Sequence, residues 1–136
     1  MMLEKKPGVA EEAFAGALER YLGETLHERI RVRPFSQAGS LPAFLTRTYS
    51  LYETSIYGHR CVFLAAAKLS ATPSDIAKHV ALVGSKINAI VVFAAPSVSA
   101  HNRSRFINQA ISFVVPGNQL YIPDIAMDLR EHFRAP

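Results

Sequence analysis

Two stretches of the chain are apolar without interruption, and they constrain the fold more than any other feature. The stretches Cys61-Val-Phe-Leu-Ala-Ala-Ala67 and Ala89-Ile-Val-Val-Phe-Ala94 contain no polar or charged side chain. A strand with one face in water alternates apolar and polar residues, whereas a strand covered on both faces is apolar throughout. The two stretches therefore predict strands inside a sheet that helices cover on both faces.

Patterns elsewhere in the chain predict the other elements. Apolar residues at helical spacing predict helices, and alternation with a period of two predicts strands. The expected helices cover residues 11 to 23 (or to 26, if Thr25 and Leu26 prolong the last turn), 41 to 48, 73 to 84, about 99 to 110 and, as a short last element, 125 to 133. The expected strands cover residues 29 to 33, 51 to 57, 60 to 67, 89 to 94, 112 to 115 and 120 to 122.

Local signals predict where several of these elements begin and end. Thr72-Pro-Ser-Asp75 is typical of a helix start, and Ser40 and either Ser97 or Ser99 are expected to cap two other helices. Gly58-His59 predicts the tight turn of a hairpin, and Pro116-Gly-Asn118 predicts a second turn.

The resulting order, α-β-(α)-β-β-α-β-α-β-β, predicts an α/β fold with a mixed central sheet. Residues 1 to 9 are expected to form a flexible tail, and residues 10 to 136 a single domain. One cysteine excludes an internal disulfide, which is typical of a reducing compartment. The N-terminus lacks the apolar core of a signal peptide, and the longest apolar run is too short and too interrupted to span a bilayer. We expect a cytoplasmic protein without a membrane partner.

The element order is also that of metal-dependent nucleases of the PD-(D/E)xK type, which suggests a restriction-endonuclease-like fold. Such a site needs an acid on the first hairpin arm, then a carboxylate and a lysine two residues apart on the second, so that Mg²⁺ and the attacked phosphate are both held. Glu53 and Lys68 occupy two of these positions, but the remaining carboxylate position is Ala66. Glu53 and Lys68 are therefore predicted to be vestigial, and the domain non-catalytic.

Other chemical sites have little support in the sequence. Cys61 opens an apolar strand, where a thiol is a buried hydrophobe rather than a nucleophile. The five histidines lack the spacing of a zinc site, and no phosphate-binding glycine loop occurs. We expect no metal and no cofactor. A helix-turn-helix over residues 76 to 90 is disfavoured, because the strand predicted from Ala89 leaves no room for a recognition helix.

The basic residues are candidates for nucleic-acid contact. The net charge is +4, and ten of the fifteen cationic residues are arginine. Arg29, Arg31 and Arg33 alternate along one expected strand, and Arg103 and Arg105 lie near the start of an expected helix. Either set is able to contact phosphate, and the alternative is a solvated surface.

The last third of the chain resembles the bacterial MarR-like transcriptional regulators. The resemblance lies in three stretches, SAHNRSRFI from Ser99, FVVPGNQLYIP from Phe113 and DLREHF from Asp128, and extends over about residues 41 to 134. In that group an α/β domain precedes a winged-helix DNA-binding domain. The resemblance implies a regulatory or dimerisation domain, with DNA as a partner through a winged helix expected after Pro136.

Asn118, Gln119 and Tyr121, in the most specific of these stretches, are candidates for a ligand or partner surface, although backbone geometry alone also explains the turn. Two alternatives to a regulatory domain remain open. One is an active nuclease-like enzyme whose acids come from another element. The other is a protein-interaction module that pairs through a sheet edge or an apolar helix face. The resemblance also leads us to expect a homodimer.

Overall fold

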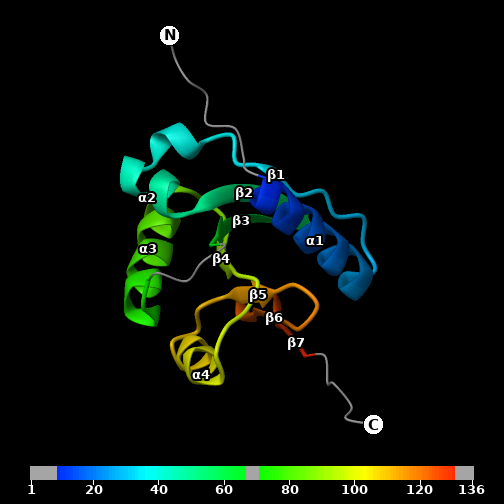
Figure 1. The fold of residues 1–136 in the computed structure, drawn as a ribbon. Coiled ribbons are helices and arrows are strands. Elements are labelled where there is room, and N and C mark those ends of the chain that lie inside the picture. The colour runs from blue at the N-terminus through cyan, green and yellow to red at the C-terminus, as the bar shows by residue number, and fades with distance from the viewer. Residues whose placement is uncertain (1–8, 67–70, 131–136) are drawn as a thin grey trace.

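A computed structural model describes residues 9–66 and 71–130 of the chain. Within them, helices and strands alternate along most of the sequence (Figure 1). The helices are α1 (Val9–Leu26), α2 (Ala43–Thr48), α3 (Pro73–Lys86) and α4 (Ala100–Asn108), with 3-10 turns at Ala38–Ser40 and Pro123–Ile125. The strands are β1 (Arg33–Pro34), β2 (Ser50–Ile56), β3 (His59–Ala65), β4 (Ile90–Ala94), β5 (Phe113–Val115), β6 (Gln119–Ile122) and β7 (Met127–Arg130).

The strands form one seven-stranded sheet in which each strand pairs with the next along the chain. β3, β4 and β5 run parallel, and the other pairs are antiparallel. The sheet is therefore mixed, and the two parallel connections contain α3 and α4. A parallel connection is almost always right-handed. Because both connections advance in the same direction across the sheet, α3 and α4 lie on the same face.

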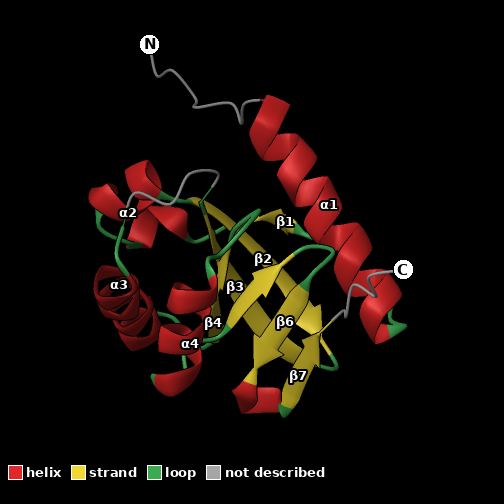
Figure 2. Ribbon diagram, turned by 60° about the horizontal axis from the view of Figure 1, so that its bottom comes forward, coloured by secondary structure: helices red, strands yellow, loops and turns green. Residues whose placement is uncertain are grey.

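The helices cover both faces of the sheet, as the sequence predicts (Figures 1 and 2). α1 packs on one face through Leu18, Leu22 and Leu26, and α2, α3 and α4 pack on the other. Neighbouring residues of β3 point to opposite faces: Phe63 joins the α1 side and Leu64 the other. Both are fully buried, which explains why this strand carries no polar residue from Cys61 onward.

Two of the predicted helix caps are confirmed and one is wrong. The Asp75 backbone N–H donates to Thr72 Oγ1 at 3.2 Å, and the Asn102 N–H donates to Ser99 Oγ at 3.1 Å. Ser40 does not cap α2, because its hydroxyl donates instead to the Gln37 carbonyl at 2.7 Å. Pro42 stands at the start of α2 without a side-chain cap.

α1 continues past Gly23 to Leu26, the longer of its two predicted ends, and His27 takes the left-handed conformation that ends the helix. Several other predicted boundaries are wrong. The strand predicted over residues 29 to 33 is reduced to β1 at Arg33–Pro34. The β2–β3 turn is Tyr57-Gly58 rather than Gly58-His59, since Ile56 pairs with His59. The end of the described chain forms β7 on the edge of the sheet instead of a last helix, because residues from Met127 pair with β6. In the part of the chain that the structure describes, no helix is long and apolar enough to cross a membrane.

Candidate functional site

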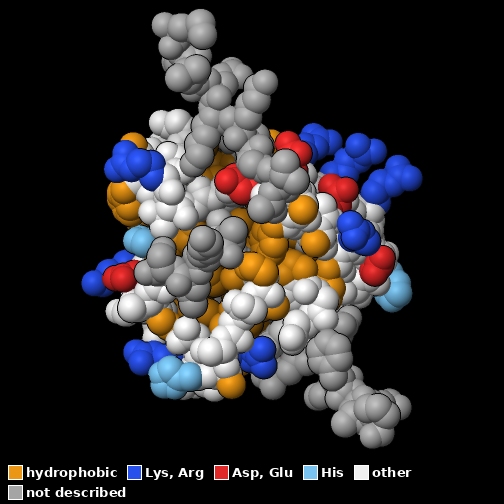
Figure 3. Space-filling model, viewed as in Figure 1, with side chains coloured by type: hydrophobic (Ala, Val, Ile, Leu, Met, Phe, Trp, Pro, Cys, Tyr) orange, Lys and Arg blue, Asp and Glu red, His pale blue; other side chains and the backbone are white. Residues whose placement is uncertain are grey.

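An open depression lined by four arginines lies between residues 29–36 and the β2–β3 hairpin. Its volume is about 740 Å³, and we refer to it as the arginine depression. The residues that line it are Arg29, Arg31, Arg33, Pro34, Ser36, Glu53, Thr54, Ser55, Gly58 and Arg60. Cationic side chains gather at the upper right of Figure 3, on the side where the segment between α1 and β1 runs in Figure 1.

The first wall of the depression owes its charge to an alternating sequence. Arg29, Arg31 and Arg33 are exposed, whereas Ile30 between them is buried against the α1 face of the sheet. Only Arg33 belongs to a regular strand, but the period of two extends over the whole segment. The three side chains that were predicted to point the same way thus line one depression. Among the described residues they form no ion pair.

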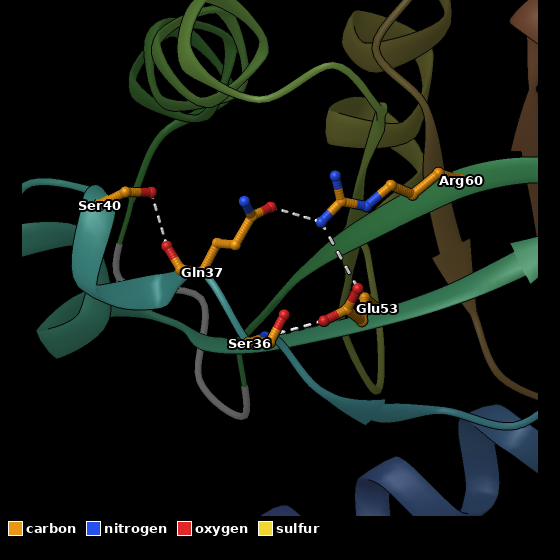
Figure 4. A network of polar contacts seen from close by, with 5 residues as sticks. All are labelled: Ser36, Gln37, Ser40, Glu53 and Arg60. Atoms are coloured by element: carbon orange, nitrogen blue, oxygen red, sulfur yellow. Dashed lines mark hydrogen bonds and ion pairs between the residues drawn. The ribbon is translucent and has the colours of Figure 1, made fainter.

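Arg60 on the hairpin forms the second wall, and its side chain is held in place by three contacts, two of which are drawn in Figure 4. Its Nη2 donates to Gln37 Oε1 at 2.6 Å and lies 3.6 Å from Glu53 Oε1. Its guanidinium carbon also lies 5.7 Å from the centre of the Phe35 ring. These contacts fix the charge of Arg60 at the edge of the depression.

Glu53 connects the two walls at this end of the depression. The Ser36 backbone N–H donates to Glu53 Oε2 at 2.8 Å, while Arg60 pairs with the other carboxylate oxygen. The Ser36 hydrogen bond and, to a smaller extent, the Arg60 charge lower the pKa of Glu53 below its usual value. Glu53 is therefore ionised at neutral pH and joins the loop after β1 to the hairpin.

Tyr57 connects the walls at the other end. Its hydroxyl donates to the Leu26 carbonyl at 2.6 Å, and its backbone N–H donates to the Glu28 carboxylate at 2.9 and 3.2 Å. Glu28 comes directly before Arg29 in the chain, and Leu26 lies three residues before it. The segment that carries the arginines is thus attached to the hairpin tip on one side and to Glu53 on the other.

The acidic residues around the depression are each engaged by a backbone N–H group. Glu28 accepts from Tyr57, Glu53 accepts from Ser36, and Glu19 accepts from the Val32 N–H at 2.8 Å. Of these three, only Glu53 lines the depression itself. Four arginines and one glutamate leave it with three formal positive charges, an arrangement suited to an anion.

The register of the hairpin separates the residues that the nuclease interpretation needs together. Glu53 lies opposite Val62, four residues before Ala66, so the two are roughly 13 Å apart along the strand. The Glu53 carboxylate is already bound by Ser36 and Arg60, which makes it a poor metal ligand. Ala66 is buried, and Lys68 lies outside the described residues. In the described ranges, no group of three or more potential metal-binding side chains lies together.

The other predicted basic pair lies elsewhere. Arg103 and Arg105 belong to α4, and neither lines the arginine depression. Arg103 is half-buried and its Nη2 lies 3.5 Å from the Val98 carbonyl, whereas Arg105 is exposed. The structure therefore does not join the two arginine sets into one surface.

The proposed ligand surface in the VPGNQLYIP stretch is not a continuous exposed surface. Gln119 is 1% exposed and directs its amide into the interior. Tyr121 is half-buried and its ring lies 5.8 Å from that of Phe113. Gly117 has a φ of 79°, and the Asn118 N–H donates to the Val115 carbonyl at 2.9 Å. The turn thus has the geometric role that its Pro and Gly residues predict.

Cys61 is unsuited to nucleophilic chemistry. Its side chain is fully buried in β3, on the α1 face of the sheet. Burial, with a smaller effect of the Asp124 charge, raises the pKa of the thiol to about 12. The thiolate is therefore absent at neutral pH, in agreement with the interpretation of Cys61 as a core residue.

Four residues of the site are not evident from the sequence, namely Ser36, Gln37, Tyr57 and Arg60. Arg60 stands directly before the apolar β3 stretch, where a charged residue looks like an ordinary strand end. The approach of Gln37 and Phe35 to Arg60 depends on the fold of the loop after β1, which no local pattern predicts.

Known proteins add no further indication of function. No protein-family model, no curated protein and no solved structure matches this chain. The arginine depression is consequently the feature from which a function can be inferred.

Proposed function

We propose that this chain is a non-catalytic regulatory domain of a DNA-binding transcriptional regulator, and that the arginine depression contacts nucleic-acid phosphates. The observation that carries the proposal is the gathering of Arg29, Arg31, Arg33 and Arg60 around one open depression. Arginine suits this role because its planar guanidinium always carries a charge and presents several donors to phosphate oxygens.

The spacing of the arginines favours a polymeric anion over a single small one. Residues two apart in an extended segment are roughly 6.6 Å apart, so Arg29, Arg31 and Arg33 form a row rather than a single cluster. A row of cations fits a row of phosphates, and each occupied phosphate releases a counterion. We therefore expect binding that weakens steeply as salt increases.

The regulatory part of the proposal rests on the resemblance to MarR-like proteins and on the contacts that occupy the Glu53 carboxylate. A carboxylate that holds Arg60 and the Ser36 N–H has a structural role in the depression rather than a role in catalysis. In such a regulator the winged helix would read the DNA sequence, and this domain would add phosphate contacts. Pairing with a second copy belongs to the same proposal, and light scattering that gives twice the chain mass would support it.

The test compares two triple variants that remove the same charge from different places. Arg29, Arg31 and Arg33 are replaced together by alanine, and the control replaces Arg47, Lys78 and Lys86, which are exposed on α2 and α3. Fluorescence anisotropy with a labelled 20-nucleotide DNA, single-stranded or duplex, is measured between 50 and 200 mM salt. Over roughly this salt range, the affinity of a protein that contacts several phosphates falls strongly.

The first variant is expected to weaken binding by at least tenfold and to reduce the salt slope by about two to three. The control is expected to retain most of the affinity and the slope. Equal loss in both variants would show that only net charge matters, and an unchanged first variant would refute the proposed site. Cleavage of the DNA with Mg²⁺ or Mn²⁺ would favour the nuclease alternative instead.

A further inference from the structure

Tyr57 is an exposed aromatic residue at the end of the arginine depression. Its side chain is 48% exposed, and with Phe44 it is one of two exposed large hydrophobic residues in the described chain. Its neighbour Gly58 lines the depression, and its partners Leu26 and Glu28 lie three residues and one residue before Arg29. Tyr57 itself does not line the depression, but it is attached to the start of the segment that carries the row of arginines.

The backbone at Tyr57 adopts a conformation that its residue type disfavours. Tyr57 and Gly58 have φ values of 48° and 80°, so both central residues of the hairpin turn are left-handed. Asn-Gly and Asp-Gly are the pairs that suit such a turn, whereas a tyrosine in the first position is strained. Asparagine would serve the turn better, so the ring itself calls for an explanation.

The ring is also held in a fixed position. The hydroxyl donates to the Leu26 carbonyl at 2.6 Å, and the Glu28 carboxylate accepts the backbone N–H. Part of the ring surface stays open to a ligand. Because the hydroxyl already anchors the ring, the side chain loses little further rotational freedom when a ligand binds. Such preorganisation strengthens binding to a flat partner.

We infer that Tyr57 stacks on a base of single-stranded nucleic acid whose phosphates lie along Arg29, Arg31 and Arg33. This rests on the proposed function and specifies its ligand. Proteins that bind single strands combine a positive groove for the backbone with aromatic rings for the bases. In a duplex the bases are stacked on one another, so a ring at the surface has no free base to contact.

The experiment separates the ring from its hydroxyl by two variants at Tyr57 and one control variant, each made in the whole chain. Tyr57→Asn removes the ring and suits the left-handed turn, so the fold is expected to be retained, with thermal unfolding by circular dichroism at or above that of the wild type. Tyr57→Phe keeps the ring and removes only the contact with Leu26. Phe44→Ala removes the other exposed ring, at 39% exposure on α2, and is the matched control.

The ligands separate stacking from phosphate contact. Labelled oligothymidylate of about 12 nucleotides, which spans one site of this kind, is compared with an abasic strand and a duplex of the same length. Oligouridylate of that length shows whether DNA or RNA binds more tightly, and the variants are then measured with the tighter ligand.

Tyr57→Asn is expected to weaken binding of the base-containing single strand roughly tenfold, as for the loss of one stacked base, and to leave the abasic strand unaffected. Tyr57→Phe, which keeps the ring but loses its anchor, is expected to weaken binding less than Tyr57→Asn does. Phe44→Ala is expected to bind within about twofold of the wild type. If Tyr57→Asn binds as the wild type does, or if the wild type prefers the duplex, the stacking inference is wrong. In that case the arginine triple variant still tests the proposed function. If this variant binds every ligand more weakly than the wild type, the proposed function stands, and if its binding is unchanged, the proposed function is refuted.

Discussion

The hydroxyl of Tyr49 lies 2.6 Å from Nδ1 of His79, and this contact joins the end of α2 to the middle of α3. The two rings lie edge to face at 5.5 Å, and Tyr49 also packs edge to face on Phe93 of β4. One buried side chain thus connects two helices with the centre of the sheet. Together with the buried Leu45, this contact holds the short α2, which has no side-chain cap, against the core.

We expect Tyr49→Phe to lower the free energy of unfolding by about 1 kcal/mol, the usual value of one hydrogen bond. Urea unfolding followed by circular dichroism measures this change. A double-mutant cycle with His79→Leu isolates the contact, and we expect a coupling energy of at least about 0.5 kcal/mol. Strictly additive single effects would show that the hydroxyl and the imidazole do not stabilise one another.

The same residue predicts a loss of stability in alkali. Burial, with a smaller effect of the Asp75 charge, raises the pKa of Tyr49 from 10.0 to about 12. Below pH 10 the phenol is protonated in both states, and above it the unfolded chain loses the proton first. The stabilising contribution is therefore complete below pH 10 and decreases as the pH approaches 12. The decrease should be smaller in Tyr49→Phe than in the wild type.

Glu53 predicts the opposite dependence, at acid pH. Its pKa is lowered in the folded state, so its contribution is complete above the pKa of the unfolded chain and is lost as the pH falls through the folded value. At pH 7 we expect Glu53→Gln to cost about 1 kcal/mol, because a charge-assisted hydrogen bond is replaced by a weaker one. The difference from the wild type should shrink as the pH falls below about 4, the region in which glutamate titrates.

Urea unfolding at several pH values between 7 and 3 measures this effect. Glu24→Gln, at an exposed position of α1, is the control for the loss of one negative charge. If both variants change with pH in the same way, Glu53 does not hold the loop to the hairpin as we describe.

Phe106 is predicted to be the most sensitive position of α4. It is fully buried, and its ring lies 5.5 Å from Phe93 and 5.4 Å from Phe113, so it packs the helix onto two strands. We expect Phe106→Ala to cost about 3–5 kcal/mol and Phe106→Leu less than about 2 kcal/mol. Similar small losses in both variants would mean that α4 is only loosely attached to the sheet.

Gln119 is expected to become more stable when its amide is removed. Neither Nε2 nor Oε1 of this buried side chain has a hydrogen-bond partner in the described part of the chain. Gln119→Met keeps the length of the side chain and removes two unpaired polar atoms, so we expect a gain of about 1 kcal/mol or more. Gln119→Glu, which introduces a buried charge, should be strongly destabilising at pH 7. A less stable Gln119→Met would contradict this account of the amide.

Much of the fold was predictable because its signals are local. The apolar β3 and β4 stretches and the Thr72 cap each lie within a few residues, and they lead to the structure observed. The alternation from Arg29 to Arg33 correctly separates exposed from buried side chains, but the strand predicted from it is wrong except at Arg33. Long, strongly patterned segments carry this information in their own composition.

The candidate site was less predictable because it depends on register. A turn at Gly58-His59 would place Glu53 opposite Leu64, whereas the turn at Tyr57-Gly58 places it opposite Val62. One residue in the turn thus moves the whole first arm relative to the second. The contacts of Arg60 with Gln37 and Phe35 depend in addition on a loop distant in sequence. No pattern within a single segment contains that information.

The strands of this sheet lie side by side in the order in which the chain presents them. Each strand therefore pairs with the strand that precedes it in the chain, and among the described residues no pair joins strands that are separated by another strand. Low sequence separation between partners is associated with rapid folding. Every residue that lines the arginine depression lies between Arg29 and Arg60, so all of them are synthesised before β4 and the later strands.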